Sequence, residues 1–397
     1  MARSGRTSRT EAALTKETTH VRRDIHDQAV PDTPLQAAPP IATRLSDDSP
    51  DAARYRAILQ RKIDEGARRA AEVIATIQRD QPRDQIVRVQ AAGFEVAPTG
   101  GVRVRVADDR YQPTDFALGQ IAGRAGIPHP YLRELAAPQA APWQQDLASE
   151  ILGRHYGNAG DGRVLVRSVR GHLRGWVSDR YRRLDSRPLV EALADEAMRA
   201  GAVPIDGVVT ETRVALKVIL PRILEPIPGE FLVAGGEWST SDYGNGVHSF
   251  RAYAIRVACL NGMTRENLLK QVHLGGRLSE EIEFSDRTHR LDTAASVSAL
   301  RDVVRGAFGP SGRDRMLGAV CAANDRTMNK SQLTTATRAL PKPVQKSVLD
   351  AFESNDVINL PEGDTAWRAS NAISWIARNT EDPELRLDLE RAAGSLV

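Results

Sequence analysis

The stretch from Arg163 to Arg187 constrains this 397-residue chain more than any other part of it. It joins the alternation of a strand pair to eight arginines and only two aspartates, a local charge of +6, whereas the whole chain carries +3. The arginines are Arg163, Arg167, Arg170, Arg174, Arg180, Arg182, Arg183 and Arg187. Guanidinium groups gathered on a strand pair face either an anionic partner or carboxylates that are distant in the sequence. The sequence leaves both possibilities open.

The composition is that of a globular protein long enough for two domains. Apolar residues make up 41% of the chain, and no run of them approaches the length of a membrane span. The first residues have no apolar signal-peptide core. We therefore expect a soluble, cytoplasmic protein without a membrane partner. Its two cysteines, Cys259 and Cys321, lie far apart, which excludes a disulfide framework.

Four regions follow one another along the chain. Residues 1–50 are rich in Thr, Ala, Pro and Arg without a sustained period, which predicts a disordered tail. Residues 51–84 have the period of a long amphipathic helix, mildly interrupted at Gly66. Residues 85–290 predict an α+β core domain, and residues 291–397 a helical C-terminal region.

Within the core, turn residues separate the expected strands. A hairpin is predicted to turn at Gly100 and Gly101, and two strands flank Gly171. A helix is expected from Asp185 or Ser186, with further strands over 212–221, ended by proline, 231–239 and 249–260. After Asn261 and Gly262 the pattern predicts mostly helix. The fold class is therefore α+β, a mainly antiparallel sheet core with packed helices and a helical C-terminal region.

Several separated segments together resemble one family of phage- and plasmid-like proteins, the domain of unknown function 932 family. The segments are 117–132, 176–193 with its Ser-Asp-Arg-Tyr-Arg motif, 256–262, 273–275 and 365–377. The chain departs from the family pattern at Thr240-Ser241-Asp242, so no role is inferred for that turn, and at Arg368. The resemblance implies a protein of a phage, prophage or plasmid, with no established reaction.

The second strand of the arginine-rich stretch carries the main candidate site. Alternation places His172, Arg174 and Trp176 on one face. Arginine beside an aromatic ring on an open sheet face is how proteins bind single-stranded nucleic acid, with bases stacked on the ring. Arg180, Arg182 and Arg183 would extend the charge at the strand exit.

Three interpretations of this face remain open. In the first, it binds nucleic acid. In the second, Trp176 is a core residue, Arg174 pairs with Asp179 or Asp242, and the other arginines are solvated. In the third, the face binds a small anion. Arg256, inside the apolar strand 249–260, either forms a structural ion pair or adds to the same basic surface.

Searches for metal sites and catalytic motifs find little. Cys259 and His273 lack companion ligands at the spacing a zinc site needs, so we expect neither a metal nor a cofactor. No phosphate-binding loop, dinucleotide fingerprint or nucleophile elbow is present. The acids near residue 360 are Glu353, Asp356, Glu362 and Asp364, and they lie in loop-like sequence. The stripe Trp367, Ile373, Trp375 and Ile376 predicts helix packing.

The sequence favours a non-enzymatic nucleic-acid-binding protein engaged in replication or recombination of a mobile element. Single-stranded DNA is the favoured partner, and self-association is possible. The predicted binding residues are His172, Arg174, Trp176, Arg180, Arg182, Arg183 and Arg256, with no catalytic residue. A protein-interaction or self-assembling protein with a basic docking face is one alternative. The other is a metal-dependent hydrolase that uses scattered acids with His248 or His273.

Overall fold

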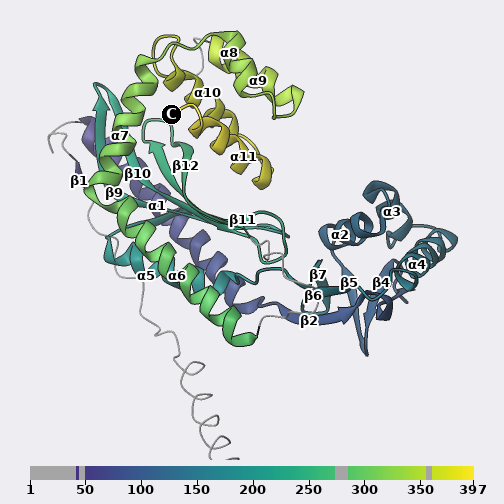
Figure 1. Cartoon of the computed structure of the whole chain (residues 1–397). Helices are drawn as coiled ribbons and strands as arrows, with labels where there is room; N and C mark the ends of the chain where they lie inside the picture. Colours follow the sequence, from purple (N-terminus) through teal and green to yellow (C-terminus); the bar gives the residue numbers. More distant parts are fainter. Residues whose placement is uncertain (1–41, 44–49, 273–284, 355–359) are drawn as a thin grey trace, which may run out of the picture. The chain divides into compact units, whose positions relative to one another are not determined.

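The computed structural model describes residues 42–43, 50–272, 285–354 and 360–397 (Figure 1). Two six-stranded sheets and eleven α-helices occupy these residues, which confirms the predicted α+β class. All of them belong to one unit, residues 40–397. The predictions made for the tail up to residue 41, for His273 and for Asp356 lie outside the described residues.

One sheet, sheet B, holds the arginine-rich hairpin. Its strands in spatial order are β2 (Arg83–Arg88), β6 (Arg163–Val169), β7 (His172–Ser178), β5 (Asp109–Pro113), β4 (Val102–Val106) and β3 (Gly93–Val96). Neighbours are antiparallel except β5 and β7, which pair in parallel where Gln112 faces His172. The one-turn 3-10 helix Val89–Ala91 follows β2.

Glycines at the turns explain both predicted hairpins of sheet B. Gly100 and Gly101 have φ of 85° and 83° between β3 and β4. Arg170 and Gly171 have φ of 49° and 79° between β6 and β7. Positive φ at both central residues is typical of the turns that match strand twist, and glycine adopts it without steric cost. Both hairpin predictions are confirmed.

Three helices cover one face of sheet B. They are α2 (Asp115–Ala125), α3 (His129–Ala136) and α4 (Pro142–Gly157). Ile121 of α2 and Leu152 of α4 are fully buried against Val164, Val166 and Trp176 of the hairpin. The Thr114 side chain caps α2 by accepting a hydrogen bond from the Ala117 backbone amide. This layer fixes which face of β7 turns inward.

The second sheet, sheet A, is larger. In spatial order its strands are β1 (Ala42–Thr43), β9 (Val214–Ile227), β10 (Glu230–Thr240), β11 (Val247–Arg256) and β12 (Asn261–Val272), and β8 (Val203–Val209) also pairs with β9. Only β1 pairs in parallel within the described strands. The predicted strands 231–239 and 249–260 correspond to β10 and β11.

Two sequence expectations about sheet A are wrong. The strand predicted to end at Pro221 continues to Ile227, because the register with β10 shifts between Val233 and Gly235, and a proline fits such an irregularity. The chain after Asn261 forms the strand β12 before any helix begins. Pairing with β11 overrides the helix-forming composition of this segment.

Four helices pack on sheet A and its edge (Figure 1). They are α1 (Pro50–Arg79), α5 (Ser186–Arg199), α6 (Asp286–Phe308) and α7 (Pro310–Asp325). The helix predicted over 51–84 is α1, which ends at Arg79 because β2 begins at Arg83, and it runs through Gly66 without interruption. A Cβ at Gly66 would lie 2.3 Å from the carbonyl carbon of Ile205, so the glycine lets α1 approach β8 closely.

The C-terminal region is helical, as predicted. It comprises α8 (Lys330–Ala336), α9 (Lys342–Glu353), α10 (Ala366–Arg378) and α11 (Pro383–Gly394). Trp367 and Ile373 are fully buried in a core shared with Leu232 and Ala254 of sheet A. Trp375 and Ile376 pack partly buried against this core, so the expected packing stripe is confirmed. None of the helices described is long and apolar enough to cross a membrane.

The N-terminal boundary can be tested by truncation. Ala42 and Thr43 pair with Arg222 and Ile223, and α1 starts at Pro50. A chain that begins at residue 40 should keep the melting temperature of the full chain. A chain that begins at Pro50 loses a two-residue strand and should melt no more than about 3 °C lower. A larger drop from the cut at residue 40, measured by thermal unfolding, would contradict the prediction that the tail is dispensable.

Candidate functional site

Trp176 does not stand on an open face. Its side chain is 3% exposed, in the core between sheet B and its helices. Its ring meets the ring of Tyr156 edge-on, with centroids 5.6 Å apart. The register between β6 and β7 shifts next to Arg167, so one extra residue on β7 reverses the alternation. The prediction that Trp176 is a stacking platform beside Arg174 is therefore wrong.

Most of the arginine charge on the hairpin is balanced by carboxylates. Six of the eight arginines form ion pairs, and the distances are Arg163–Asp179 3.3 Å, Arg167–Asp84 2.8 Å, Arg170–Asp80 3.1 Å, Arg182–Asp292 2.5 Å, Arg183–Asp84 3.4 Å and Arg187–Glu191 3.0 Å. Four of these carboxylates lie outside the segment, and they reduce its charge from +6 to +2. Of the two possibilities left open by the sequence, distant carboxylates account for most of the charge.

Arg167 is the centre of this ion-pair framework. Its side chain is 1% exposed and lies between Asp84 of β2 and Asp185, whose carboxylate oxygen is 2.5 Å from Nη2. The guanidinium also donates to the backbone carbonyl of Asp242. Burial alone would lower the pKa of Arg167, but the charges of Asp185, Asp84 and Asp242 outweigh it and raise the pKa. Arg167 therefore joins sheet B, the start of α5 and the β10–β11 turn.

Asp242, in the turn to which the sequence assigned no role, caps α5 from a distance. Its Oδ1 accepts hydrogen bonds from the amide of Ser186 at 2.9 Å and from the hydroxyl of Ser186 at 2.7 Å. Asp185 occupies the N-cap position but makes no capping bond, because its carboxylate pairs with Arg167. Burial raises the pKa of Asp242 to about 6. Only the tertiary structure brings these groups together.

The start of β7 opens into a groove with a volume of about 430 Å³, which we call the β7 groove. It contains two of the predicted residues, His172 and Arg174, together with Arg170 of the hairpin turn. The other residues that line it are Thr76, Asp80, Thr114, Val169, Val209, Thr210 and Glu211. Its size is in the range of ligand sites, and its lining offers hydroxyl and guanidinium groups.

Arg174 is the least compensated arginine of this groove. Its guanidinium carbon lies 4.7 Å from the centre of the Tyr243 ring, and Nη2 donates to the backbone carbonyl of Glu211 at 2.5 Å. Its Nε is buried without a hydrogen-bond partner among the described atoms. Arg174 pairs with neither of the carboxylates considered from the sequence, Asp179 or Asp242. It keeps its charge beside a groove and is held there by a ring and a carbonyl.

The arginines at the other end of β7 are placed differently. Arg182 donates to both carboxylate oxygens of Asp292 and to the hydroxyl of Ser296, so it fixes α6. Arg183 is paired with Asp84. Arg180 is half-buried and, within the described part of the chain, its side chain forms no ion pair. The structure therefore divides the predicted binding surface between the two ends of one strand.

Arg256 belongs to the structural framework of sheet A. Its guanidinium binds both oxygens of Glu230, at 2.5 and 2.6 Å, and the indole of Trp367 donates to the same carboxylate at 3.1 Å. These contacts anchor α10 to β10 and β11. Of the two roles considered for Arg256, the structural ion pair is confirmed.

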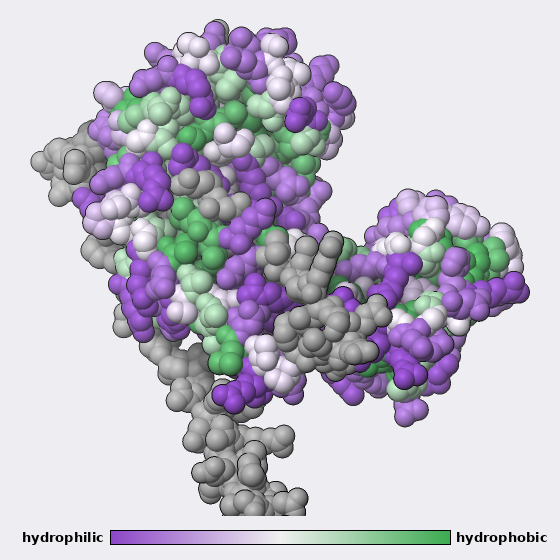
Figure 2. Space-filling view, in the orientation of Figure 1, coloured by the Kyte–Doolittle hydropathy of each residue, from purple (hydrophilic) through white to green (hydrophobic). Residues whose placement is uncertain are grey.

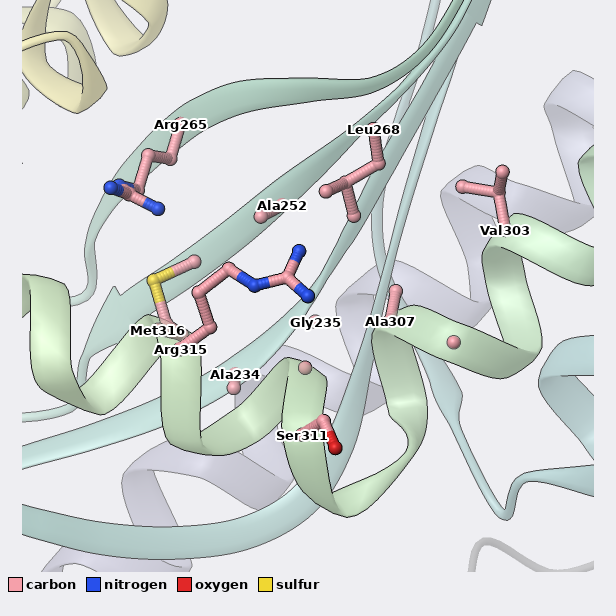
Figure 3. A pocket seen from close by; sticks show the side chains of 12 residues that line it. Ala234, Gly235, Ala252, Arg265, Leu268, Val303, Ala307, Ser311, Arg315 and Met316 are labelled. Carbon is pink, nitrogen blue, oxygen red and sulfur yellow. The ribbon is translucent and has the colours of Figure 1, made fainter.

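A second pocket lies between sheet A and the bend from α6 to α7 (Figure 3). Small residues such as Ala234, Ala252 and Ala307 line its volume of about 320 Å³. The guanidinium of Arg315 reaches over these residues, and Arg265 lies at one side of the pocket (Figure 3). Hydrophilic side chains cover much of the surface seen in Figure 2, with smaller hydrophobic patches between them.

The groups considered for hydrolysis do not converge within the described residues. No group of three or more His, Cys, Asp or Glu side chains there could hold a metal ion. His248 is fully buried, and burial lowers its pKa to about 4, while its Nδ1 lies 3.0 Å from the Gln271 amide oxygen. Glu353 pairs with Lys330 at the surface. Cys259 is buried beside Arg256 at the end of β11.

Comparison with protein-family models, with curated proteins and with solved structures found no match in any of the three. The resemblance to the domain of unknown function 932 family stays a prediction. The functional argument therefore depends on the geometry of the chain itself.

The buried pair of Arg256 and Glu230 predicts a large effect on stability. Replacing Arg256 by Met leaves a buried carboxylate without its cation and should lower the free energy of unfolding by about 3–5 kcal/mol. The double variant Glu230→Gln/Arg256→Met keeps an acceptor for Trp367 without the charge and should recover most of that loss. Urea unfolding of both variants measures this. Equal losses in the single and the double variant would contradict the structural assignment.

The raised pKa of Asp242 predicts a pH dependence. Its carboxyl takes up a proton in the folded state near pH 6 but in the unfolded state only near pH 3.8. Folding is therefore favoured more at pH 5 than at pH 7, and the gain is lost as the pH rises through 6. The free energy of unfolding of the parent, minus that of Asp242→Asn, should increase on the order of 1 kcal/mol between pH 7 and pH 5.

Both proteins contain His248, whose lowered pKa changes stability with pH in the opposite direction. Subtracting one free energy of unfolding from the other removes this shared contribution. Asp146→Asn, the same substitution at an exposed position of α4, is the matched control. A constant difference for Asp242→Asn in urea unfolding at the two pH values would show that Asp242 is ionised throughout this range.

Proposed function

We propose that this chain is a nucleic-acid-binding protein that contacts the phosphate backbone from the β7 groove. The observation that carries the proposal is Arg174, a guanidinium that the Tyr243 ring fixes at the groove and that is bonded to no carboxylate among the described residues. Arg170 and His172 lie in the same groove, and Arg180, which forms no ion pair within the described part of the chain, lies at the far end of the strand. Arginine binds phosphate oxygens with a rigid set of donors.

Binding of this kind carries little sequence information, because phosphate contacts position a ligand without identifying its bases. With Trp176 in the core, the proposal no longer includes base stacking, so the expected preference for single strands over duplex is weaker than the sequence predicts. Asp80 and Glu211 line the same groove, and their negative charge favours modest affinity for a polyanion. The family resemblance supports a role in a phage, prophage or plasmid.

The test is the salt dependence of binding to a labelled oligonucleotide. Replacing Arg174 by Gln should remove one phosphate contact and reduce the log-log salt slope for a single strand by about 0.7. Arg187→Gln is the matched control, because Arg187 belongs to the same segment but pairs with Glu191 on the surface of α5. That variant should keep the parental slope.

Fluorescence anisotropy with single-stranded DNA, duplex DNA and RNA at several salt concentrations gives the slopes. Equal slopes for the parent and Arg174→Gln would remove the β7 groove from the proposal. A parent with no measurable affinity for any of the three at low salt would refute nucleic-acid binding and would favour the alternative of a protein-docking surface.

A further inference from the structure

A pocket lined by three arginines lies where α11 ends against β11 and β12. Arg251 of β11, Arg265 of β12 and Arg391 of α11 line it together with Thr264, Gly394 and Ser395, and its volume is about 430 Å³. We call it the arginine pocket. Among the described residues, no acidic side chain lines it.

Close packing of backbones brings the arginines of this pocket together. Gly394 lies so near β12 that a Cβ would be 2.1 Å from the carbonyl oxygen of Thr264. The lack of a side chain lets the end of α11 reach the strand, which places Arg391 beside Arg251. Arg251 lies opposite Glu237 in the pairing of β10 with β11. The pocket is therefore built from the consecutive strands β11 and β12 and from α11, which is distant from them in the sequence.

One buried carboxylate serves two of these arginines. Glu237 is 0% exposed, and its Oε1 is 3.3 Å from Nη2 of Arg391 and 3.8 Å from Nη1 of Arg251. Its Oε2 accepts a hydrogen bond from the hydroxyl of Thr264 at 2.9 Å. The remaining carboxylate near Arg391 is that of Asp388, which is largely exposed and 3.5 Å away.

Among the described residues, Arg251 and Arg391 therefore share one buried carboxylate, Glu237, and the second carboxylate, Asp388, is largely exposed. The Arg251 side chain is 13% exposed, and burial, followed by the positive charge of Arg391, lowers its pKa to about 10. The Nε of Arg391 is buried and has no hydrogen-bond partner among the described atoms. An anion in the pocket would supply opposite charge to the buried guanidinium of Arg251 and a hydrogen-bond acceptor to the buried Nε of Arg391. It would thereby offset the cost of burying both groups.

We propose that the arginine pocket binds the phosphate group of a small anionic ligand, with Arg251, Arg265 and Arg391 as donors. Tetrahedral phosphate fits converging guanidinium groups better than a single carboxylate does, because each guanidinium can reach a different oxygen. Arg265 also lines the pocket of Figure 3, so the two pockets are neighbours. The phosphate belongs either to a free molecule or to the end of a nucleic-acid strand, since both present the same chemistry.

Equilibrium dialysis of the full chain with labelled inorganic phosphate, and calorimetry with AMP, test the proposal. One binding site per chain is expected. Arg391→Gln and Arg251→Gln should each weaken binding at least about tenfold, which corresponds to about 1.4 kcal/mol. Arg338→Gln is the control, because Arg338 is exposed in the loop after α8, away from the arginines that line the pocket. If Arg251→Gln fails to fold, Arg265→Gln takes its place.

Two oligonucleotides that differ only in a 5′-phosphate or a 5′-hydroxyl distinguish the source of the phosphate. A free ligand is indicated if inorganic phosphate and AMP bind, and a strand end if only the 5′-phosphorylated oligonucleotide depends on Arg391. If none of these phosphate ligands binds the parent, or if the arginine variants bind them as the parent does, the proposal is overturned.

This proposal does not depend on nucleic-acid binding at the β7 groove. Arg174→Gln should leave the affinity for inorganic phosphate unchanged, and Arg391→Gln should leave the salt slope for the 5′-hydroxyl oligonucleotide unchanged. Either site can therefore fail its test without affecting the other.

Discussion

The contacts of Arg167 hold together parts of the chain that are distant in the sequence. A fully buried guanidinium needs carboxylates close by, because the transfer of its charge out of water costs far more than one hydrogen bond returns. Asp84, Asp185 and the carbonyl of Asp242 meet that need from β2, the start of α5 and the β10–β11 turn. The edge of sheet B is thereby tied to sheet A. Burial raises the pKa of Asp242, and the charge of Arg167 offsets only part of that effect.

This arrangement changes how the arginine-rich stretch should be understood. A local charge of +6 in the sequence suggests a surface prepared for an anion, but most of that charge stabilises the fold through pairs that span sheets and helices. Among the described residues, positive charge that can still attract an anion lies where an arginine has no carboxylate partner or shares one with another arginine. Arg174 stacks on a ring, and Arg251 and Arg391 share Glu237. The balance within each cluster, rather than the number of arginines, indicates where an anion can bind.

Local signals in the sequence were sufficient for much of the fold. Turns with positive φ at Gly100 and Gly101 and at Gly171 define two hairpins, and the spacing of Trp367 and Ile373 defines the buried face of α10. The sequence pattern was not sufficient to predict features that depend on how two strands pair. The extra residue on β7 turns Trp176 into the core, and β12 is a strand only because β11 pairs with it. The alternation of residues in one strand cannot predict a bulge, because a bulge is defined by how the strand pairs with its neighbour.

Both proposed sites depend on residues that single-sequence reasoning could not connect. The turn that holds Asp242 also supplies Tyr243, whose ring supports Arg174 and whose carbonyl accepts a hydrogen bond from Gln120 at 2.8 Å. Gln120 in turn accepts a hydrogen bond from the backbone amide of Trp176 at 2.7 Å. One turn thus caps α5, completes the contacts of Arg167 and positions the arginine of the β7 groove. A change that loosens this turn should therefore weaken stability and ligand binding together, whereas a change at Arg174 itself should affect binding alone.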